Sequence, residues 1–368
     1  MKPMFEKVCI IGVGLIGGSL GMALCSRKLA KRVIGVDINT DELQLAMELE
    51  AIHEGSIDPA SAAADADLVV IATPVGLTVE MVKKIAPVVK KGCIVTDVGS
   101  TKAQIVREAE MLMPSGTFFV GGHPMTGSET AGVKGADRYL FENAAYILTP
   151  SAVTDQAAVN AAERLALAVG AKVVKIDPQE HDLMVAAVSH LPHLVATVLV
   201  NTVGEIQKDH NDVLMLAAGG FRDTTRVASG QPLMWRDICI TNRGKILEVL
   251  DRFSNALQET RHFIESCDDK GLESRFTMAR ELRNTIPAKM RGYLPTTHEI
   301  VVTIADKPGA ISSLAGCLGA NGININDIEI LRVREGEGGT IRLALSSEAD
   351  QEKAIKILRA NGVVVKKK

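Results

Sequence analysis

Short apolar runs alternate with helix-compatible segments along the first 176 residues. The helical spacing predicts helices such as Asp41–Glu50 and Thr101–Leu112. Alternation of this kind is typical of parallel β-α-β units with helices on both faces of the sheet. We therefore expect an α/β fold, with a doubly wound parallel sheet over residues 1–176. The apolar runs predict strands at Val8–Ile11, Val33–Val36, Leu68–Ala72, Cys93–Thr96, Phe118–Val120, Tyr146–Leu148 and Val173–Ile176.

The pattern changes at Pro178, where strand signals end and apolar residues recur at helical spacing, as in Leu247, Leu250, Phe253 and Leu257. We expect an all-helical domain over residues 177–290. The stretch Asn284–Thr297 holds three Pro and Gly residues with little periodicity and is predicted to be a linker.

A third pattern follows over residues 298–368, which we expect to form a separate small domain. Its order of elements, β-α-β-β-α-β, is that of the ferredoxin-like split motif. The predicted elements are the strand Ile300–Ile304, the helix Ile311–Ala320, the strands Ile325–Val333 and Thr340–Leu345, the helix Ala349–Ala360 and the strand Val363–Val365.

Composition narrows the function classes. Apolar residues make up 46% and charged residues 23%, which is ordinary for a globular chain. A net charge of −3 and 3% aromatic residues exclude a chain-wide nucleic-acid surface. The six cysteines form no C-x-x-C pair and are expected to be free thiols in the cytosol. Polar residues interrupt even the apolar stretch Val185–Val200, so we expect no membrane span.

A glycine-rich turn follows the first strand and opens a helix. Its residues are Gly12, Val13, Gly14, Leu15, Ile16 and Gly17. Glycines at this spacing allow a tight turn, close approach of a pyrophosphate and close packing of helix on strand. Asp37 stands 20 residues after Gly17, where its carboxylate would accept hydrogen bonds from ribose hydroxyls and repel a 2′-phosphate. We predict an NAD site of Rossmann type, with a ligand-free turn as the alternative.

Further polar residues follow the next three predicted strands: Thr73 with Pro74, then Ser100, then His123. The carboxyl ends of parallel strands share one sheet edge, so these residues should surround one crevice. His123 suits proton abstraction from a hydroxyl during hydride transfer. Ser100 could assist it. The alternatives are a loop histidine bonded to a backbone carbonyl and a serine that caps the next helix.

The helical domain adds the segment Ser189-His190-Leu-Pro-His193 and two arginines, Arg222 and Arg226. The histidine spacing could suggest a metal, but no Cys or carboxylate completes a set, so we expect none. The arginines suit carboxylate recognition, and surface ion pairs are the alternative.

Taken in order, these motifs resemble the prephenate dehydrogenase family in the form that carries a C-terminal ACT domain. The resemblance rests on G-V-G-L-I-G, D-V-G-S-T-K, G-G-H-P-M-T-G-S-E, V-S-H-L-P-H, G-G-F-R-D-T-T-R and M-W-R-D, and it spans essentially the whole chain. It implies oxidative decarboxylation of prephenate to 4-hydroxyphenylpyruvate with NAD, by a homodimer formed through the helical domain.

The resemblance also implies roles for single residues. His123 would be the base, with Ser100 assisting, and Arg226 would hold a substrate carboxylate. His193 would lie near the side-chain end of the substrate. The supporting or gating residues of the pocket would be Ser189, His190, Ser128 and Glu129.

The last segment resembles an ACT domain, a module that binds amino acids near its first loop. The implied regulatory residues are Asp306, Pro308, Gly309 and Asn324, and the expected effector is L-tyrosine. A purely structural dimerisation module is the alternative. For the whole chain, the rivals are an arogenate dehydrogenase and a non-catalytic regulator that senses NAD and an amino acid.

Overall fold

The computed structural model describes residues 3–127, 130–286, 298–305, 307–334 and 338–367. It forms two compact units, residues 1–292 and 293–368. The sequence-based boundary near residue 176 falls inside the first unit and stays a prediction.

An eight-stranded sheet organises the amino-terminal part of the first unit, in the order β3-β2-β1-β4-β5-β6-β7-β8. Strands β1 to β6 pair parallel with one another. Their side chains alternate between two buried cores, as Val8 and Ile10 face one and Cys9 and Ile11 the other. The strands are β1 (Phe5–Ile11), β2 (Ala30–Val36), β3 (Glu54–Ser56), β4 (Leu68–Ile71), β5 (Ile94–Asp97), β6 (Phe118–Pro124), β7 (Ala145–Thr149) and β8 (Lys172–Lys175).

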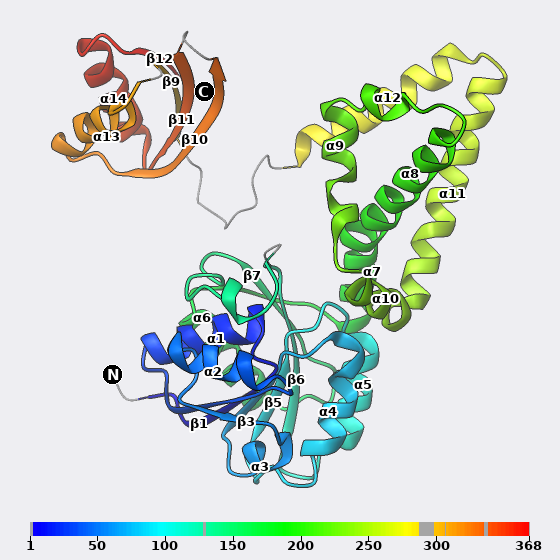
Figure 1. Ribbon diagram of the computed structural model, residues 1–368, viewed down its shortest axis with the longest axis vertical. Coiled ribbons are helices and arrows are strands. Elements are labelled where there is room, and N and C mark those ends of the chain that lie inside the picture. The colour runs from blue at the N-terminus through cyan, green and yellow to red at the C-terminus, as the bar shows by residue number, and fades with distance from the viewer. Residues whose placement is uncertain (1–2, 128–129, 287–297, 306, 335–337, 368) are drawn as a thin grey trace. The chain divides into compact units, whose positions relative to one another are not determined.

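Helices cover both faces of this sheet, as the doubly wound pattern predicts (Figure 1). One core packs under α1 (Leu15–Ser26), α2 (Thr40–Glu48) and α6 (Gln156–Ala168). The other packs under α3 (Pro59–Ala63), α4 (Thr78–Ile85) and α5 (Ala103–Leu112).

Two details differ from the sequence prediction. The strand β7 pairs antiparallel with β6, and β8 follows β7, so the sheet is not wholly parallel. For β7 to run parallel to β6, the chain would need a long crossover connection between them. The described residues between β6 and β7 hold only the short 3₁₀ helix η2 (Val133–Gly135). The strand β3 was missed because its three residues, Glu54–Ser56, contain no apolar run.

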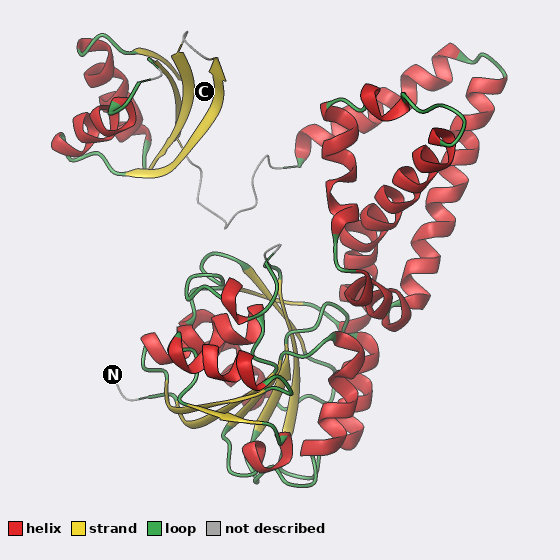
Figure 2. Cartoon of the chain, viewed as in Figure 1, coloured by secondary structure: helices red, strands yellow, loops and turns green. Residues whose placement is uncertain are grey.

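The rest of the first unit is helical, as predicted (Figure 2). The described stretch 178–286 holds α7 (Pro178–Val185), the π-helical turn η3 (Ala186–His190), α8 (Leu191–Gln207), the 3₁₀ turn η4 (Val213–Leu216), α9 (Gly219–Thr225), the 3₁₀ turn η5 (Arg226–Ser229), α10 (Pro232–Thr241), α11 (Arg243–Glu265) and α12 (Asp269–Thr285). The predicted linker begins later than expected, because Asn284 and Thr285 continue α12. The remainder of that linker, 287–297, lies outside the described residues.

The continuous helix Pro178–Gln207 is long and apolar enough to cross a membrane by length and composition alone. Its polar side chains argue for a different role. His181, Asp182, His190 and His193 all face inward and are buried against the rest of the unit. The helix therefore serves as a wall of the site described below.

The second unit matches the predicted split motif. Its antiparallel sheet has the order β10-β11-β9-β12, with both helices on one face (Figure 2). Its core lies between that face and the helices. The elements are β9 (His298–Ile304), α13 (Ala310–Ala320), β10 (Ile325–Arg334), β11 (Gly338–Leu345), α14 (Glu348–Ala360) and β12 (Val364–Lys367).

Candidate active site

The glycine-rich turn between β1 and α1 has the geometry of a phosphate cradle. Gly12 has φ of +96°, and a Cβ there would lie 2.7 Å from the backbone of Ala72. A Cβ on Gly17 would lie 1.9 Å from the Gly12 carbonyl oxygen, so this glycine lets helix and turn pack together. A Cβ on Gly14 would meet nothing within 4 Å. The space above Gly14 is open at the start of α1, where backbone amides favour an anion.

Asp37 is held against this turn. Its Oδ2 accepts a hydrogen bond of 3.2 Å from the Val13 amide, and its Oδ1 accepts one of 3.0 Å from the Asn39 amide. Each oxygen keeps a lone pair for a ribose hydroxyl. The next residue, Ile38, is 95% exposed. An apolar side chain held in water beside a carboxylate with free lone pairs suits contact with an adenine ring.

Thr73 and Pro74 follow β4, beside the Gly12 turn. The Thr73 hydroxyl is buried and has no hydrogen-bond partner among the residues that the structure describes. A buried polar atom without a partner is costly, so a ligand group is the natural partner here. The turn, the carboxylate and this hydroxyl together fit a dinucleotide.

His123 lies near the end of β6 and is half-buried. Its Nδ1 is 2.9 Å from Nε2 of His181, on α7. The pKa of His123 is lowered well below its ordinary value, first by burial and then by His181, Lys102 and His190. A neutral imidazole is the form that can accept a proton.

A buried ion pair lies next to the strand residue that precedes His123. The ammonium of Lys102 contacts the carboxylate of Asp97, and both side chains are fully buried. Lys102 Nζ also donates to the Gly122 carbonyl at 2.9 Å, next to His123. Burial lowers the pKa of Lys102, while Asp97 opposes that shift.

Ser100 follows β5 at the same edge, where the sequence placed it. It does not cap the next helix, which begins at Ala103 without a cap from its own N-cap side chain. Instead the carboxylate of Asp182 accepts hydrogen bonds from the Lys102 and Ala103 amides, at 2.7 and 2.9 Å. The capping alternative for Ser100 is therefore wrong, because a carboxylate from α7 occupies that position.

The two histidines of the S-H-L-P-H segment pack around Trp235 of α10. The His193 ring stacks on the indole at 3.5 Å, and His190 meets it edge-on at 6.1 Å. His190 also lies 3.2 Å from the amide nitrogen of Asn242. Burial lowers the pKa of both histidines, that of His190 to about 4. The turn that carries them, η3, is π-helical, a conformation common at functional sites.

Arg226 begins η5, one residue before Val227, whose backbone acts to raise the pKa of His193 and so opposes the effect of burial. Its side chain is exposed, and Ser189 is half-buried in η3. Ser128 and Glu129 lie outside the described residues. Contacts thus link His123, through His181, Asp182 and Asn242, to His190, Trp235 and His193.

The sequence missed His181, Asp182, Asn242 and Trp235 as members of this site. His181 and Asp182 lie on α7, and the burial of two adjacent polar residues on a helix cannot be read from spacing. Within the described ranges, no group of three or more His, Cys, Asp or Glu could hold a metal ion.

In the second unit, Pro308 and Gly309 form the turn before α13, where Gly309 has φ of +84°. Asn324 precedes β10 and donates to the Asn326 side chain at 2.9 Å. Asp306 lies outside the described residues.

Three family models match the chain. They describe the nucleotide-binding domain of prephenate dehydrogenase over residues 20–175, its dimerization domain over 177–278 and an ACT domain over 298–363. Prephenate dehydrogenase of Bacillus subtilis is 37% identical over 98% of this chain and 97% of its own length.

The chain belongs to the prephenate dehydrogenase family.

Two solved members show the same architecture. Prephenate dehydrogenase of A. aeolicus, in complex with hydroxyphenyl propionate and NAD+, is 32% identical with a TM-score of 0.72, over 76% of this chain and 98% of that one. Synechocystis arogenate dehydrogenase is 30% identical with a TM-score of 0.67, over 76% and 99%. The expected family, enzyme class, fold and NAD cofactor are confirmed by these matches.

Proposed function

We propose that this protein catalyses the NAD-dependent oxidative decarboxylation of prephenate to 4-hydroxyphenylpyruvate. The observation that carries the proposal is His123. It is a neutral imidazole at the carboxyl edge of the sheet that holds the dinucleotide turn, and His181 engages its Nδ1. The alternative function, a non-catalytic sensor of NAD and an amino acid, would not require a base at this position.

Bound NAD would supply the hydride acceptor. The chain would supply orientation and one proton acceptor. The carbon that bears the ring hydroxyl loses hydride, the hydroxyl proton passes to His123, and the bond to the ring carboxylate breaks. Carbon dioxide leaves, and its bonding electrons complete an aromatic phenolate, which becomes the phenol by taking back a proton from His123 or from water. Aromatisation drives the reaction, so a positioned base, worth about 10²–10⁴-fold in rate, and alignment of the reactants are sufficient.

The remaining residues would bind substrate. Arg226 would hold a carboxylate, and Ser100 would hydrogen-bond the reacting hydroxyl. His193, neutral and stacked on Trp235, would lie near the side-chain end, with Ser189 and His190 supporting the pocket wall.

We propose a preference for prephenate over arogenate because His193 carries no fixed negative charge. Arogenate carries an ammonium group where prephenate has a keto group, and a carboxylate would be its natural partner. One solved relative is an arogenate dehydrogenase, so the fold serves both substrates.

An absorbance assay at 340 nm with each substrate and each of NAD and NADP tests these assignments. We expect turnover with prephenate and NAD. The His123→Asn variant should bind NAD normally and keep less than about a tenth of the turnover. Equal turnover with arogenate would contradict the proposed specificity. A fully active His123→Asn variant would contradict the assignment of His123 as the base.

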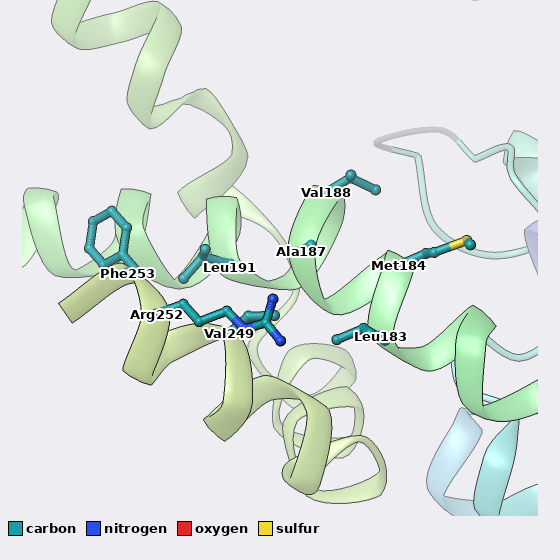
Figure 3. A pocket seen from close by; sticks show the side chains of 8 residues that line it. All are labelled: Leu183, Met184, Ala187, Val188, Leu191, Val249, Arg252 and Phe253. Carbon is teal, nitrogen blue, oxygen red and sulfur yellow. The ribbon is translucent and has the colours of Figure 1, made fainter. Parts of the chain in front are cut away.

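We propose a homodimer built through the helical region. An open apolar groove runs between α7–α8 and α11, lined by Leu183, Met184, Ala187, Val188, Leu191, Val249, Arg252 and Phe253 (Figure 3). Val188 is 70% exposed there, and the dimerization-domain model covers this segment. A second copy would cover the groove. Light scattering should give twice the chain mass, and the Val188→Glu variant should shift toward monomer.

We further propose that each of the three regions has its own role. Residues 1–176 would bind NAD, residues 177–290 would form the dimer and bind substrate, and residues 298–368 would regulate the enzyme. L-tyrosine would act through the ACT domain, near Pro308, Gly309 and Asn324.

Six free thiols suit a reducing compartment, and we place the enzyme in the cytosol.

A further inference from the structure

Two buried side chains on α7 form a chain of hydrogen bonds that ends at His123. His181 and Asp182 are consecutive, and their exposed fractions are 0% and 1%. Nε2 of His181 lies 2.9 Å from Nδ1 of His123. Nδ1 of His181 lies 2.9 Å from Oδ1 of Asp182. The three side chains form one line of hydrogen bonds from α7 to the crevice.

The chemistry of the donors fixes the direction of these bonds. An ionised carboxylate only accepts hydrogen bonds, so Nδ1 of His181 carries a proton toward Asp182. In a neutral ring, Nε2 of His181 is then an acceptor. Nδ1 of His123 must donate to it. The remaining nitrogen of His123, Nε2, therefore keeps its lone pair.

Asp182 is itself held from several directions. Its carboxylate accepts hydrogen bonds from the amides of Lys102 and Ala103, and its backbone carbonyl accepts one of 2.8 Å from the Asn242 side chain. These anchors come from the start of α5 and the start of α11. The two amides hold the buried carboxylate in one orientation, and the carboxylate in turn orients His181 through its Nδ1.

We propose that His181 and Asp182 are positioning residues, which hold His123 as the Nδ1–H tautomer and leave its Nε2 to receive the substrate proton. The proposal rests on His123 being the base, as proposed above. The wrong tautomer would present an N–H to the substrate hydroxyl and could not accept its proton. The charged and titratable groups around His123, namely Lys102, His181 and His190, all favour its neutral form, in which tautomer choice matters.

Two substitutions at His181 separate positioning from packing. In His181→Gln, the amide oxygen can stand near the place of Nε2 and accept from His123. In His181→Leu, a side chain of similar size offers no acceptor. We expect His181→Leu to lower kcat by about 10²-fold or more, with the KM for prephenate changed less than about threefold. His181→Gln should stay within about tenfold of wild-type kcat. His210→Leu, at an exposed histidine of the same region, is the matched control.

A second readout does not depend on turnover. Long-range ¹H–¹⁵N spectra of histidine-labelled enzyme report which ring nitrogen carries the proton. The His123 signals are identified by their loss in His123→Asn. Wild-type His123 should show the Nδ1–H form, and His181→Leu should shift it toward the Nε2–H form.

The proposal is overturned if wild-type His123 carries its proton on Nε2, which needs no variant to fold. It is also overturned if His181→Gln and His181→Leu lower kcat equally, because an amide acceptor would then give no rescue. The same holds if neither variant lowers kcat. The base assignment fails separately, through full activity of His123→Asn.

Discussion

At the scale of single residues, burial decides the protonation of the site. His123, His190 and His193 all have lowered pKa values, and burial is the first cause in each case. Burial disfavours the imidazolium cation because the protein solvates charge less well than water. The site thus holds three histidines neutral, beside the buried cation of Lys102.

Acidification should therefore destabilise the fold through His190. Its folded pKa of about 4 is below its ordinary value of 6.5, so between these values the unfolded chain binds more protons. Stability from this group is complete above pH 6.5 and is lost as the pH falls toward 4. The loss is about 3 kcal/mol. Urea unfolding of wild type and His190→Asn across this range should show a flatter profile for the variant. Parallel profiles would contradict the assignment.

Arg226 gives the clearest test of substrate binding. It is exposed and lies beside the segment that contacts His193, so its removal should not disturb the core. We expect Arg226→Ala to raise the KM for prephenate about tenfold or more, with a smaller fall in kcat, because a carboxylate contact acts in ground and transition states alike. An unchanged KM in a folded variant would assign Arg226 to a surface ion pair.

At the scale of elements, the ends of strands and helices build the site. The turn between β1 and α1 and the ends of β4, β5 and β6 lie at one edge of the sheet, and the first turn of α7 contacts the end of β6 through His181 and His123. The start of α5 is capped by Asp182 of α7, so a helix end and the position of the base share one carboxylate. We therefore expect changes at Asp182 to affect both the stability of α5 and the proposed function of His123.

The glycine turn offers a matched pair of variants. In Gly17→Ala, the new Cβ would lie 1.9 Å from the Gly12 carbonyl oxygen, so the turn must deform. We expect a loss of about 3 kcal/mol in unfolding free energy. In Gly14→Ala, the Cβ meets nothing within 4 Å, so the fold should tolerate it. NAD affinity should fall, because a methyl group stands where the pyrophosphate would approach.

Calorimetry of NAD binding and thermal unfolding of both variants would check this pair. Wild-type NAD affinity in Gly14→Ala would place the pyrophosphate elsewhere. A fully stable Gly17→Ala would mean that the turn can move without cost.

At the scale of the whole molecule, we expect catalysis and regulation to belong to separate units. The chain forms two compact units, and the second has its own core between sheet and helices. A unit with its own core can bind an effector without being part of the crevice. Its influence on the site must then act through a shared equilibrium between states.

Deletion of residues 296–368 tests where tyrosine acts. We expect the truncated enzyme to stay active and to lose inhibition by L-tyrosine. In the full chain, substrate and tyrosine should weaken each other's binding by the same factor, typically about 5–150-fold. Initial rates and tyrosine titrations of both forms would measure this. Unchanged inhibition after truncation would place tyrosine in the catalytic crevice, since it resembles the aromatic product.

The sequence by itself determined the order of the main elements apart from β3, the glycine turn, Asp37 and the edge positions of Ser100 and His123. These follow from local rules, because apolar periodicity, strand ends and turn glycines depend on neighbours in the chain. Tertiary structure alone decided the antiparallel β7, the cap on α5 and the partner of His123. In each case residues far apart in sequence meet, as His123 meets His181 across 58 positions. No local pattern encodes such a contact, because it arises from how α7 packs against the end of the sheet.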